Sequence, residues 1–385
     1  MNYELLKKIG FQPLATSFKL DASLYRTFLY LSIFSFFITS CRPDKIGGLG
    51  DIPYNPTTYD LKIPSQFPQM DIPVDNPMTT EGVELGRFLF YDKLLSANST
   101  MSCASCHLSA MNFTDGKTVS KGIDNLDGRR SSMSLENVGF VNKGLFWDGR
   151  VKTLEEQALL PVEDPIELHN KWTQVVEKLK VHADYPTRFR KAFGITDPSQ
   201  ITKELAAKAM AQFERTLISG NAKVDKIFRR EAEFTNDEYS GYLLFFNAAG
   251  APDAQCGHCH TTPFYNSNDY FNNGLDSVSN LMNFKDLGRG QFTKKELDNG
   301  KFRVPTLRNI ELSAPYMHDG RFKTLEEVVE HYASGGHYSD NIDPFIPQIA
   351  QIQLSDKQKK QIILFLKTLT DTSFTQNPAF QDPFK

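Results

Sequence analysis

Two five-residue strings constrain this 385-residue chain more than any other feature. Residues 103–107 read Cys-Ala-Ser-Cys-His and residues 256–260 read Cys-Gly-His-Cys-His. C-x-x-C-H is the attachment site of a c-type haem, in which both thiols bond to the haem vinyl groups and the histidine is placed to ligate the iron. A zinc site or a thiol redox pair is the alternative, but zinc would not require a histidine directly after each second cysteine. The motifs therefore predict two covalently bound haems c.

Each motif supplies three haem-binding residues. His107 and His260 are the expected proximal iron ligands. The residues expected to attach the two haems are Cys103, Cys106, His107, Cys256, Cys259 and His260.

The fifth cysteine, Cys41, ends a segment that is typical of an export signal. Residues 1–27 carry four Lys/Arg against two Asp/Glu, residues 28–37 are apolar, and Ile-Thr-Ser precedes the cysteine. This layout predicts a lipoprotein-type signal peptide over 1–40, with Cys41 lipidated at the periplasmic or cell-envelope side. An uncleaved anchor is the alternative, although about 13 suitable residues fall short of the roughly 20 that span a bilayer.

The rest of the chain repeats itself once. Residues 147–156 (Trp-Asp-Gly-Arg-Val-Lys-Thr-Leu-Glu-Glu) match residues 318–327 (His-Asp-Gly-Arg-Phe-Lys-Thr-Leu-Glu-Glu). The haem motifs lie 153 residues apart and these strings 171 apart, so the second copy carries about 18 extra residues, expected between Tyr265 and Arg303.

The repeat predicts two fused domains behind an extended tether. The expected limits are 41–75 for the tether and N-terminal extended segment, 76–228 for the first haem domain, 229–375 for the second, and 376–385 for a tail.

Helical periodicity dominates both copies. Apolar residues recur at helical spacing from Ile201 to Leu217, with Ser199 as the candidate N-cap, and again from Ile362 to Leu369 behind Ser355. Long alternating strand patterns are absent. The fold class is therefore predicted as all-α: two fused cytochrome c-like domains, each with one covalently bound haem c.

From about residue 76 to 370 the chain resembles the bacterial dihaem cytochrome c peroxidases and the related MauG proteins. The resemblance rests on both haem motifs, on 146–150 (Phe-Trp-Asp-Gly-Arg), on 154–158 (Leu-Glu-Glu-Gln-Ala), on 305–309 (Pro-Thr-Leu-Arg-Asn) and on 314–320 (Ala-Pro-Tyr-Met-His-Asp-Gly). It implies an oxidoreductase in which the first haem is the peroxide site and the second an electron-transfer site.

In that family a distal glutamate lies 20 residues after the tryptophan, a glutamine ten after it, and a proline in the same pocket. These positions are Glu167, Gln157 and Pro161. Trp147 would lie between the haems and relay electrons, although an indole is also a common core residue. Reductively activated members carry a distal histidine about 16 residues past the proximal one. The present chain has no histidine between His107 and His169, so the resemblance implies an open first site, as in MauG.

The resemblance also implies the ligands of the second site. Fourteen residues after His318, where many members have methionine and MauG has tyrosine, this chain has Tyr332. His331, His337 and Met317 are the alternatives. The family further places a calcium between the domains, for which Ser313 and Pro315 would offer backbone carbonyls. The third ligand, an asparagine in the family, is Ser131 here.

Three functions remain open on these grounds. The first is a periplasmic peroxidase that reduces H2O2 with electrons from a small cytochrome c or cupredoxin; the second is a MauG-like oxidase acting on a protein or another large substrate. The third is a dihaem electron carrier without catalysis. A net charge of −3 gives no support for nucleic-acid binding, and the family resemblance allows a homodimer.

Overall fold

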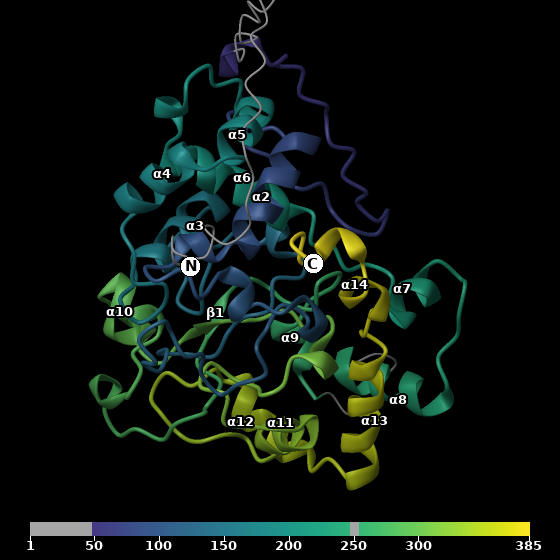
Figure 1. The fold of residues 1–385 in the computed structure, drawn as a ribbon. Coiled ribbons are helices and arrows are strands. Elements are labelled where there is room, and N and C mark those ends of the chain that lie inside the picture. The colour runs from purple at the N-terminus through teal and green to yellow at the C-terminus, as the bar shows by residue number, and fades with distance from the viewer. Residues whose placement is uncertain (1–47, 247–253) are drawn as a thin grey trace, which may run out of the picture. The chain divides into compact units, whose positions relative to one another are not determined.

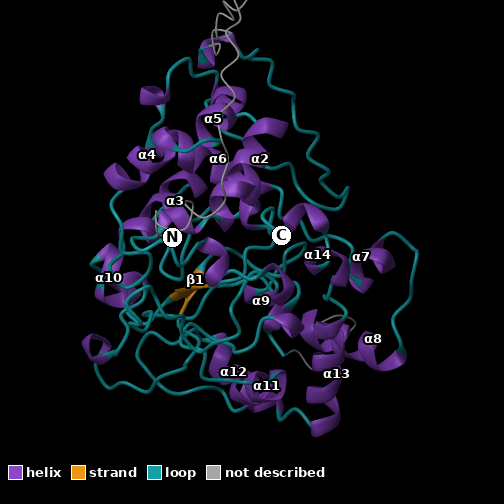
Figure 2. Cartoon of the chain, in the orientation of Figure 1, coloured by secondary structure: helices purple, strands orange, loops and turns teal. Residues whose placement is uncertain are grey.

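Helices joined by long loops make up the described part of the computed structural model, residues 48–246 and 254–385 (Figures 1 and 2). Among these residues the only strands are β1 (Tyr270–Phe271) and β2 (Phe302–Arg303), which pair antiparallel. The all-α prediction is therefore confirmed. The helices of the first copy are α2 (Thr80–Tyr91), α3 (Leu154–Glu163), α4 (Trp172–Val181), α5 (Tyr185–Phe193), α6 (Lys203–Arg215) and α7 (Lys223–Phe228). Those of the second are α8 (Asn236–Phe246), α9 (Cys256–Cys259), α10 (Arg289–Thr293), α11 (Leu325–Ala333), α12 (Phe345–Ile352), α13 (Asp356–Lys367) and α14 (Thr372–Thr375).

The two copies use the same helix crossing. α2 crosses α6 so closely that a Cβ at Gly86 would lie 1.9 Å from the carbonyl oxygen of Ala209. In the second copy α8 crosses α13, and a Cβ at Gly241 would lie 1.9 Å from the carbonyl oxygen of Gln361. Only glycine permits such a backbone approach. Two separate apolar cores form around these crossings.

A pair of left-handed asparagines marks the same point in each copy. Asn137 has φ of 58° and donates its backbone N–H to the carbonyl of Leu217 at 2.7 Å. Asn309 has φ of 54° and donates to Leu369 at 3.1 Å. Asparagine is among the few residue types that adopt this conformation readily. Each bond connects the loop before the asparagine to the residues that follow α6 or α13, so the loop has the same position relative to that helix in both copies.

The extra residues of the second copy lie before the second of these asparagines. Tyr265 and Asn309 are 44 residues apart, whereas their counterparts Phe113 and Asn137 are 24 apart. β1 and β2 close this longer stretch, and α10 lies within it. We call residues 272–301 the insertion.

Of the two predicted helix caps, one is confirmed and one is wrong. Ser355 caps α13 as predicted, with its side chain accepting from the N–H of Gln358. The Ser199 cap was wrong. α6 begins at Lys203 behind Thr202, whose hydroxyl accepts from Leu205, because Asp197 bonds the Ser199 N–H and holds a separate short turn over residues 198–200.

The N-terminal predictions fall mostly outside the described residues. The signal segment and Cys41 are among residues 1–47, so lipidation stays a prediction. Within the described ranges no helix has the length and apolar character needed to cross a bilayer. The predicted domain limits also remain predictions.

Candidate active site

Each haem motif forms a tight turn that puts its residues on one wall of a cavity. The N–H of His107 donates to the carbonyl of Cys103, and the N–H of His260 to that of Cys256, both at 3.0 Å. The cysteine side chains of both motifs are thiols rather than disulfides. They are therefore available for the thioether bonds that the motifs predict.

Both proximal histidines are oriented in the same way. Nδ1 of His107 lies 2.8 Å from the carbonyl oxygen of Phe113, and Nδ1 of His260 lies 2.8 Å from that of Tyr265. A carbonyl can only accept, so Nδ1 carries the proton and Nε2 keeps its lone pair for a metal. Burial lowers the pKa of both imidazoles, that of His260 to about 4, which keeps the rings neutral.

The first cavity unites most residues predicted for the peroxide site. Its lining includes His107 with the two thiols of residues 103–106, and also Gln157, Pro161, Glu167 and Trp147. α3 positions Gln157 and Pro161, because Thr153 caps that helix in a reciprocal bond with Glu156.

Glu167 stands in a half-buried position just beyond α3. Burial raises the pKa of its carboxyl group above the ordinary value, and the nearby carboxylate of Asp164 adds to this; Arg150 and Arg129 oppose the shift. A carboxyl group with a raised pKa is suited to take up and release protons near neutral pH.

No second histidine faces this cavity among the described residues. The loop in which reductively activated relatives carry one packs its backbone against the glutamate instead: the N–H of Ile123 donates to the carbonyl of Glu167 at 2.9 Å. The next histidine, His169, points elsewhere and pairs with Asp124. His107 is thus the one histidine in the cavity's lining.

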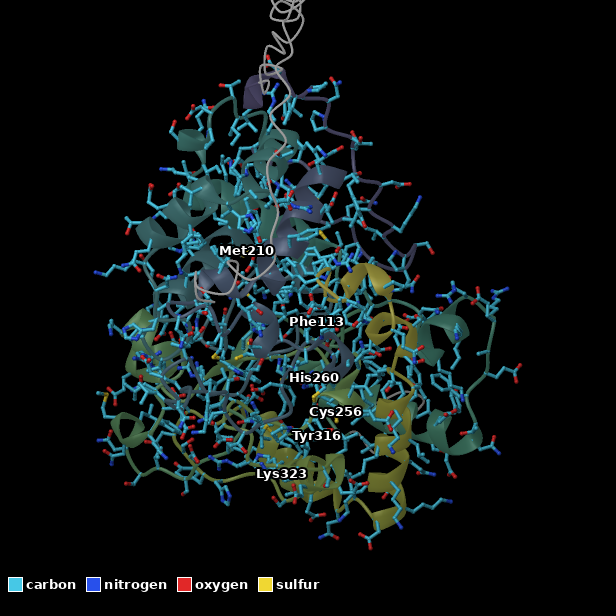
Figure 3. All side chains as sticks on the ribbon, viewed as in Figure 1. Phe113, Met210, Cys256, His260, Tyr316 and Lys323 are labelled. Atoms are coloured by element: carbon cyan, nitrogen blue, oxygen red, sulfur yellow. The ribbon has the colours of Figure 1, made fainter. Side chains whose placement is uncertain are left out.

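The second cavity distinguishes the candidate distal ligands. Tyr332 and Met317 line it together with His260, whereas His331 and His337 do not. His331 is instead held by a 3.0 Å contact between its Nε2 and the carbonyl of Asn273. Figure 3 labels three residues that line this cavity, Cys256, His260 and Tyr316. It also labels Met210 of α6, which lines the first cavity.

The amide of Asn273 lies between the two remaining candidates. Its Nδ2 is 3.3 Å from the hydroxyl of Tyr332 and 3.3 Å from the sulfur of Met317. Burial raises the pKa of the Tyr332 phenol to about 12, and the bond from Asn273 opposes the shift.

Trp147 lies in the wall that separates the cavities and lines both of them. Its indole N–H donates to the carbonyl of Ser131 at 3.0 Å, and its own carbonyl accepts from the N–H of Arg303 at 2.7 Å. Its ring lies edge-on to His318, with 6.5 Å between centroids. The tryptophan is therefore fixed between the sites by both copies.

Arg303 is a site residue that sequence reasoning missed. It is 6% exposed, lines both cavities, and forms no ion pair with a carboxylate among the described residues. Burial lowers the pKa of its guanidinium to about 10. A buried cation with no carboxylate in ion-pair contact among the described residues fits the carboxylate of a haem propionate. Aligning the two copies on Asn137 and Asn309 puts Arg303 at the position of Ser131. This alignment marks Arg303 as a difference between the copies, but it does not show that the side chain is buried.

The donor sets fit two haems c. Each cavity has two thiols, a neutral histidine with a fixed Nδ1 bond and a large apolar lining. The wall between them contributes Arg303, a cation that would pair with an anionic group of a haem.

The sequence comparisons agree with this fit: the family model described as "Di-haem cytochrome c peroxidase" matches residues 80–233. The chain is 33% identical over 300 residues to the methylamine utilization protein MauG of Methylorubrum extorquens, covering 77% of this chain and 80% of that protein.

The chain belongs to the dihaem cytochrome c peroxidase and MauG family. It is also 35% identical over 309 residues to the cytochrome c551 peroxidase of Nitrosomonas europaea, with 79% and 84% of the two chains covered. A crystal structure of a MauG-like protein associated with microbial copper homeostasis shares 34% identity with a TM-score of 0.78, covering 85% of this chain and all of that one. Family members are peroxidase-type oxidoreductases with two haems, and relatives of both kinds are similar to this chain.

The calcium expected from the resemblance stays a prediction. Ser313 and Pro315 line the second cavity together with Ser131. The hydroxyl of Ser131, however, donates to the carbonyl of Met317 at 2.8 Å. These oxygen donors are all uncharged, and calcium affinity rises with the charge of the ligands.

Proposed function

We propose that this protein is a dihaem peroxidase that reduces H2O2 to two waters. The observation that carries the proposal is the first cavity, which is lined by His107, Gln157 and Glu167 and by no second histidine of the described residues. The reaction consumes two electrons and two protons. A small cytochrome c or cupredoxin would supply the electrons. It would meet the enzyme in the periplasm, to which residues 1–40 would direct a chain anchored through Cys41.

The roles of the chain's residues follow from their positions. Bound haem supplies the iron that accepts peroxide and the first of the electrons that break the O–O bond. Glu167 takes the proton from the oxygen nearer the metal and returns it to the leaving oxygen, so that the latter departs as water. Gln157, held on α3, offers an amide that orients the peroxide by hydrogen bonding.

The direct experiment is steady-state turnover of H2O2 with a reduced cytochrome c or cupredoxin. The holoenzyme should work from its fully oxidised state without prior reduction, because His107 is the one histidine that the described part of the chain places in the first cavity. A lag that only pre-reduction removes would contradict the open first site, and no turnover in any redox state would contradict the peroxidase function itself.

Trp147 is expected to carry electrons between the sites. Replacing it with phenylalanine keeps an aromatic ring but removes the easily oxidised indole and the bond to Ser131. Stopped-flow spectra should then show slower peroxide-driven oxidation of the second haem, with cyanide binding at the first haem unchanged. Oxidation at the wild-type rate would leave Trp147 as a packing residue.

A second candidate function, a MauG-like oxidase of a large substrate, is favoured by Tyr332. Phenolate ligation stabilises ferric and higher iron states, which suits an enzyme that removes electrons from its substrate. Peroxide-dependent oxidation of a protein substrate, with no acceleration by a reduced cytochrome, would support this candidate over the first.

The Tyr332 assignment predicts a change of potential. A Tyr332→Met variant should raise the reduction potential of the second haem, by on the order of 0.1 V within the roughly 0.8 V that axial ligands span. Spectroelectrochemistry measures the shift, and His331→Gln is the matched control because His331 does not line the cavity. If Tyr332→Met leaves the potential unchanged and Met317→Leu alters it, Met317 is the ligand.

A further inference from the structure

The insertion of the second copy contributes residues to the first cavity. Although it lies after the second motif in the chain, its α10 turn gives Gln291 and Phe292 to the lining of the first cavity. Neither residue lines the second cavity. The peroxide site is thus completed by a segment of the other copy, and Figure 1 shows α10 at the level where the two groups of helices meet.

Contacts with the first copy hold the insertion in place. Asp286 accepts two bonds from the guanidinium of Arg130, at 2.7 and 2.9 Å. Arg289 lies over the ring of Tyr270, 3.7 Å from its centroid, and the Tyr270 hydroxyl donates to the carbonyl of Lys143 at 2.8 Å. The Arg130–Asp286 and Tyr270–Lys143 bonds join residues more than 120 positions apart in the chain, so tertiary contacts fix α10 against the first copy.

The turn is also braced within the insertion. A Cβ at Gly290 would lie 1.9 Å from the side-chain oxygen of Asn299. Asn299 is 3% exposed, and its amide Nδ2 donates to the carbonyl of Leu281 at 3.2 Å. Gly288, with φ of 52°, pairs with Lys301. Such close packing makes α10 a fixed edge of the cavity.

Phe292 belongs to the exposed part of the cavity lining. Its side chain lines the cavity and is nonetheless 53% exposed. Two exposed cationic residues of the first copy, Lys121 and Arg129, line the same cavity. These exposed lining residues, which we call the mouth, combine an aromatic ring from α10 with two cationic side chains of the first copy that are paired with Asp127 and Asp164.

We propose that Phe292, together with Gln291, determines the size of hydroperoxide that reaches the first haem: it admits H2O2 and hinders hydroperoxides with a bulky organic group. The inference rests on the proposed peroxidase function and names its substrate class. For a hydroperoxide ROOH, the O–O bond breaks with two electrons from the donor protein and two protons, giving ROH and water. The chemistry is the same for both substrates, so only access separates them.

The test compares two substrates in the holoenzyme. In Phe292→Ala the ratio of kcat/KM for cumene hydroperoxide to kcat/KM for H2O2 should rise at least about tenfold, the usual size of a steric discrimination in a pocket. Leu297→Ala is the matched control, since Leu297 is 67% exposed on the same insertion and lines neither cavity. An unchanged ratio in Phe292→Ala, or an equal rise in Leu297→Ala, overturns the proposal.

A binding measurement separates this proposal from the peroxidase function. Optical stopped flow follows cyanide and 4-phenylimidazole as they bind the ferric first haem. Phe292→Ala should bind 4-phenylimidazole faster, and Phe292→Trp more slowly, relative to cyanide. If wild-type enzyme shows no peroxide turnover but these rates change as stated, the peroxidase function fails and the mouth assignment stands. If turnover is present and the relative rates stay equal, the mouth assignment fails alone.

Discussion

Replacing Glu167 with glutamine should lower kcat/KM for H2O2 by about 10²- to 10⁴-fold, the usual contribution of a positioned acid or base. Glutamine keeps the size of the side chain and its place in the first cavity but cannot accept or return a proton. Because His107, the expected iron ligand, is untouched, the resting optical spectrum should stay that of the wild type. Steady-state kinetics with a reduced donor protein measures the loss.

The pH profile gives a second readout of the same residue. Glu167 must be a carboxylate to take the first proton, and burial raises its pKa above the ordinary value. Activity should therefore be present above that raised pKa and fall as the pH drops through it, and the Gln variant should lack this acidic limb. Glu163→Gln is the matched control, since Glu163 is exposed at the end of the same α3 helix and does not line the cavity. Turnover within threefold of wild type in Glu167→Gln would remove the residue from catalysis.

Local spacing explains why much of this site could be predicted. Gln157 and Pro161 are four residues apart on the capped helix α3, and Glu167 follows four residues after its end, where its N–H donates to the carbonyl of Asp164. The proximal histidines are fixed by motifs of five residues. Where a site is built from one short stretch, its sequence carries most of its geometry.

At the second site, sequence spacing alone could not identify the distal residue. Tyr332 and His331 are neighbours on α11, and successive residues on an α-helix point about 100° apart. The sequence could not say which of the two faces the iron; the structure turns Tyr332 into the cavity and His331 toward the carbonyl of Asn273.

Residues brought in by tertiary contacts were not predictable. Arg303 and Phe292 reach the first cavity from the second copy, 196 and 185 residues after His107. Their placement depends on the pairing of β1 with β2 and on the bond of the Arg303 N–H to Trp147. Ser199 failed as a helix cap for a local reason: the side chain of Asp197 accepts from its N–H, so Ser199 lies inside the short 198–200 turn and Thr202 caps α6.

The Arg308–Asp225 pair predicts the largest effect on stability. Arg308 forms two 2.9 Å bonds to Asp225 of α7, and the two side chains are 2% and 1% exposed. Arg308→Met removes the cation and leaves a buried carboxylate without its partner, which should cost about 3–5 kcal/mol in the free energy of unfolding. Urea denaturation of the holoprotein measures the loss, which should appear as a lower midpoint.

A double-mutant cycle tests the reason for this loss. If the cost comes from the stranded charge, adding Asp225→Leu to Arg308→Met should recover part of the stability, because well-packed apolar residues often replace a buried ion pair without loss. Arg321→Met is the exposed control: Arg321 pairs with Asp276 at a site about one-third exposed, where such pairs contribute at most about 1 kcal/mol. If Arg308→Met costs no more than Arg321→Met, the buried pair does not hold α7 to the second copy.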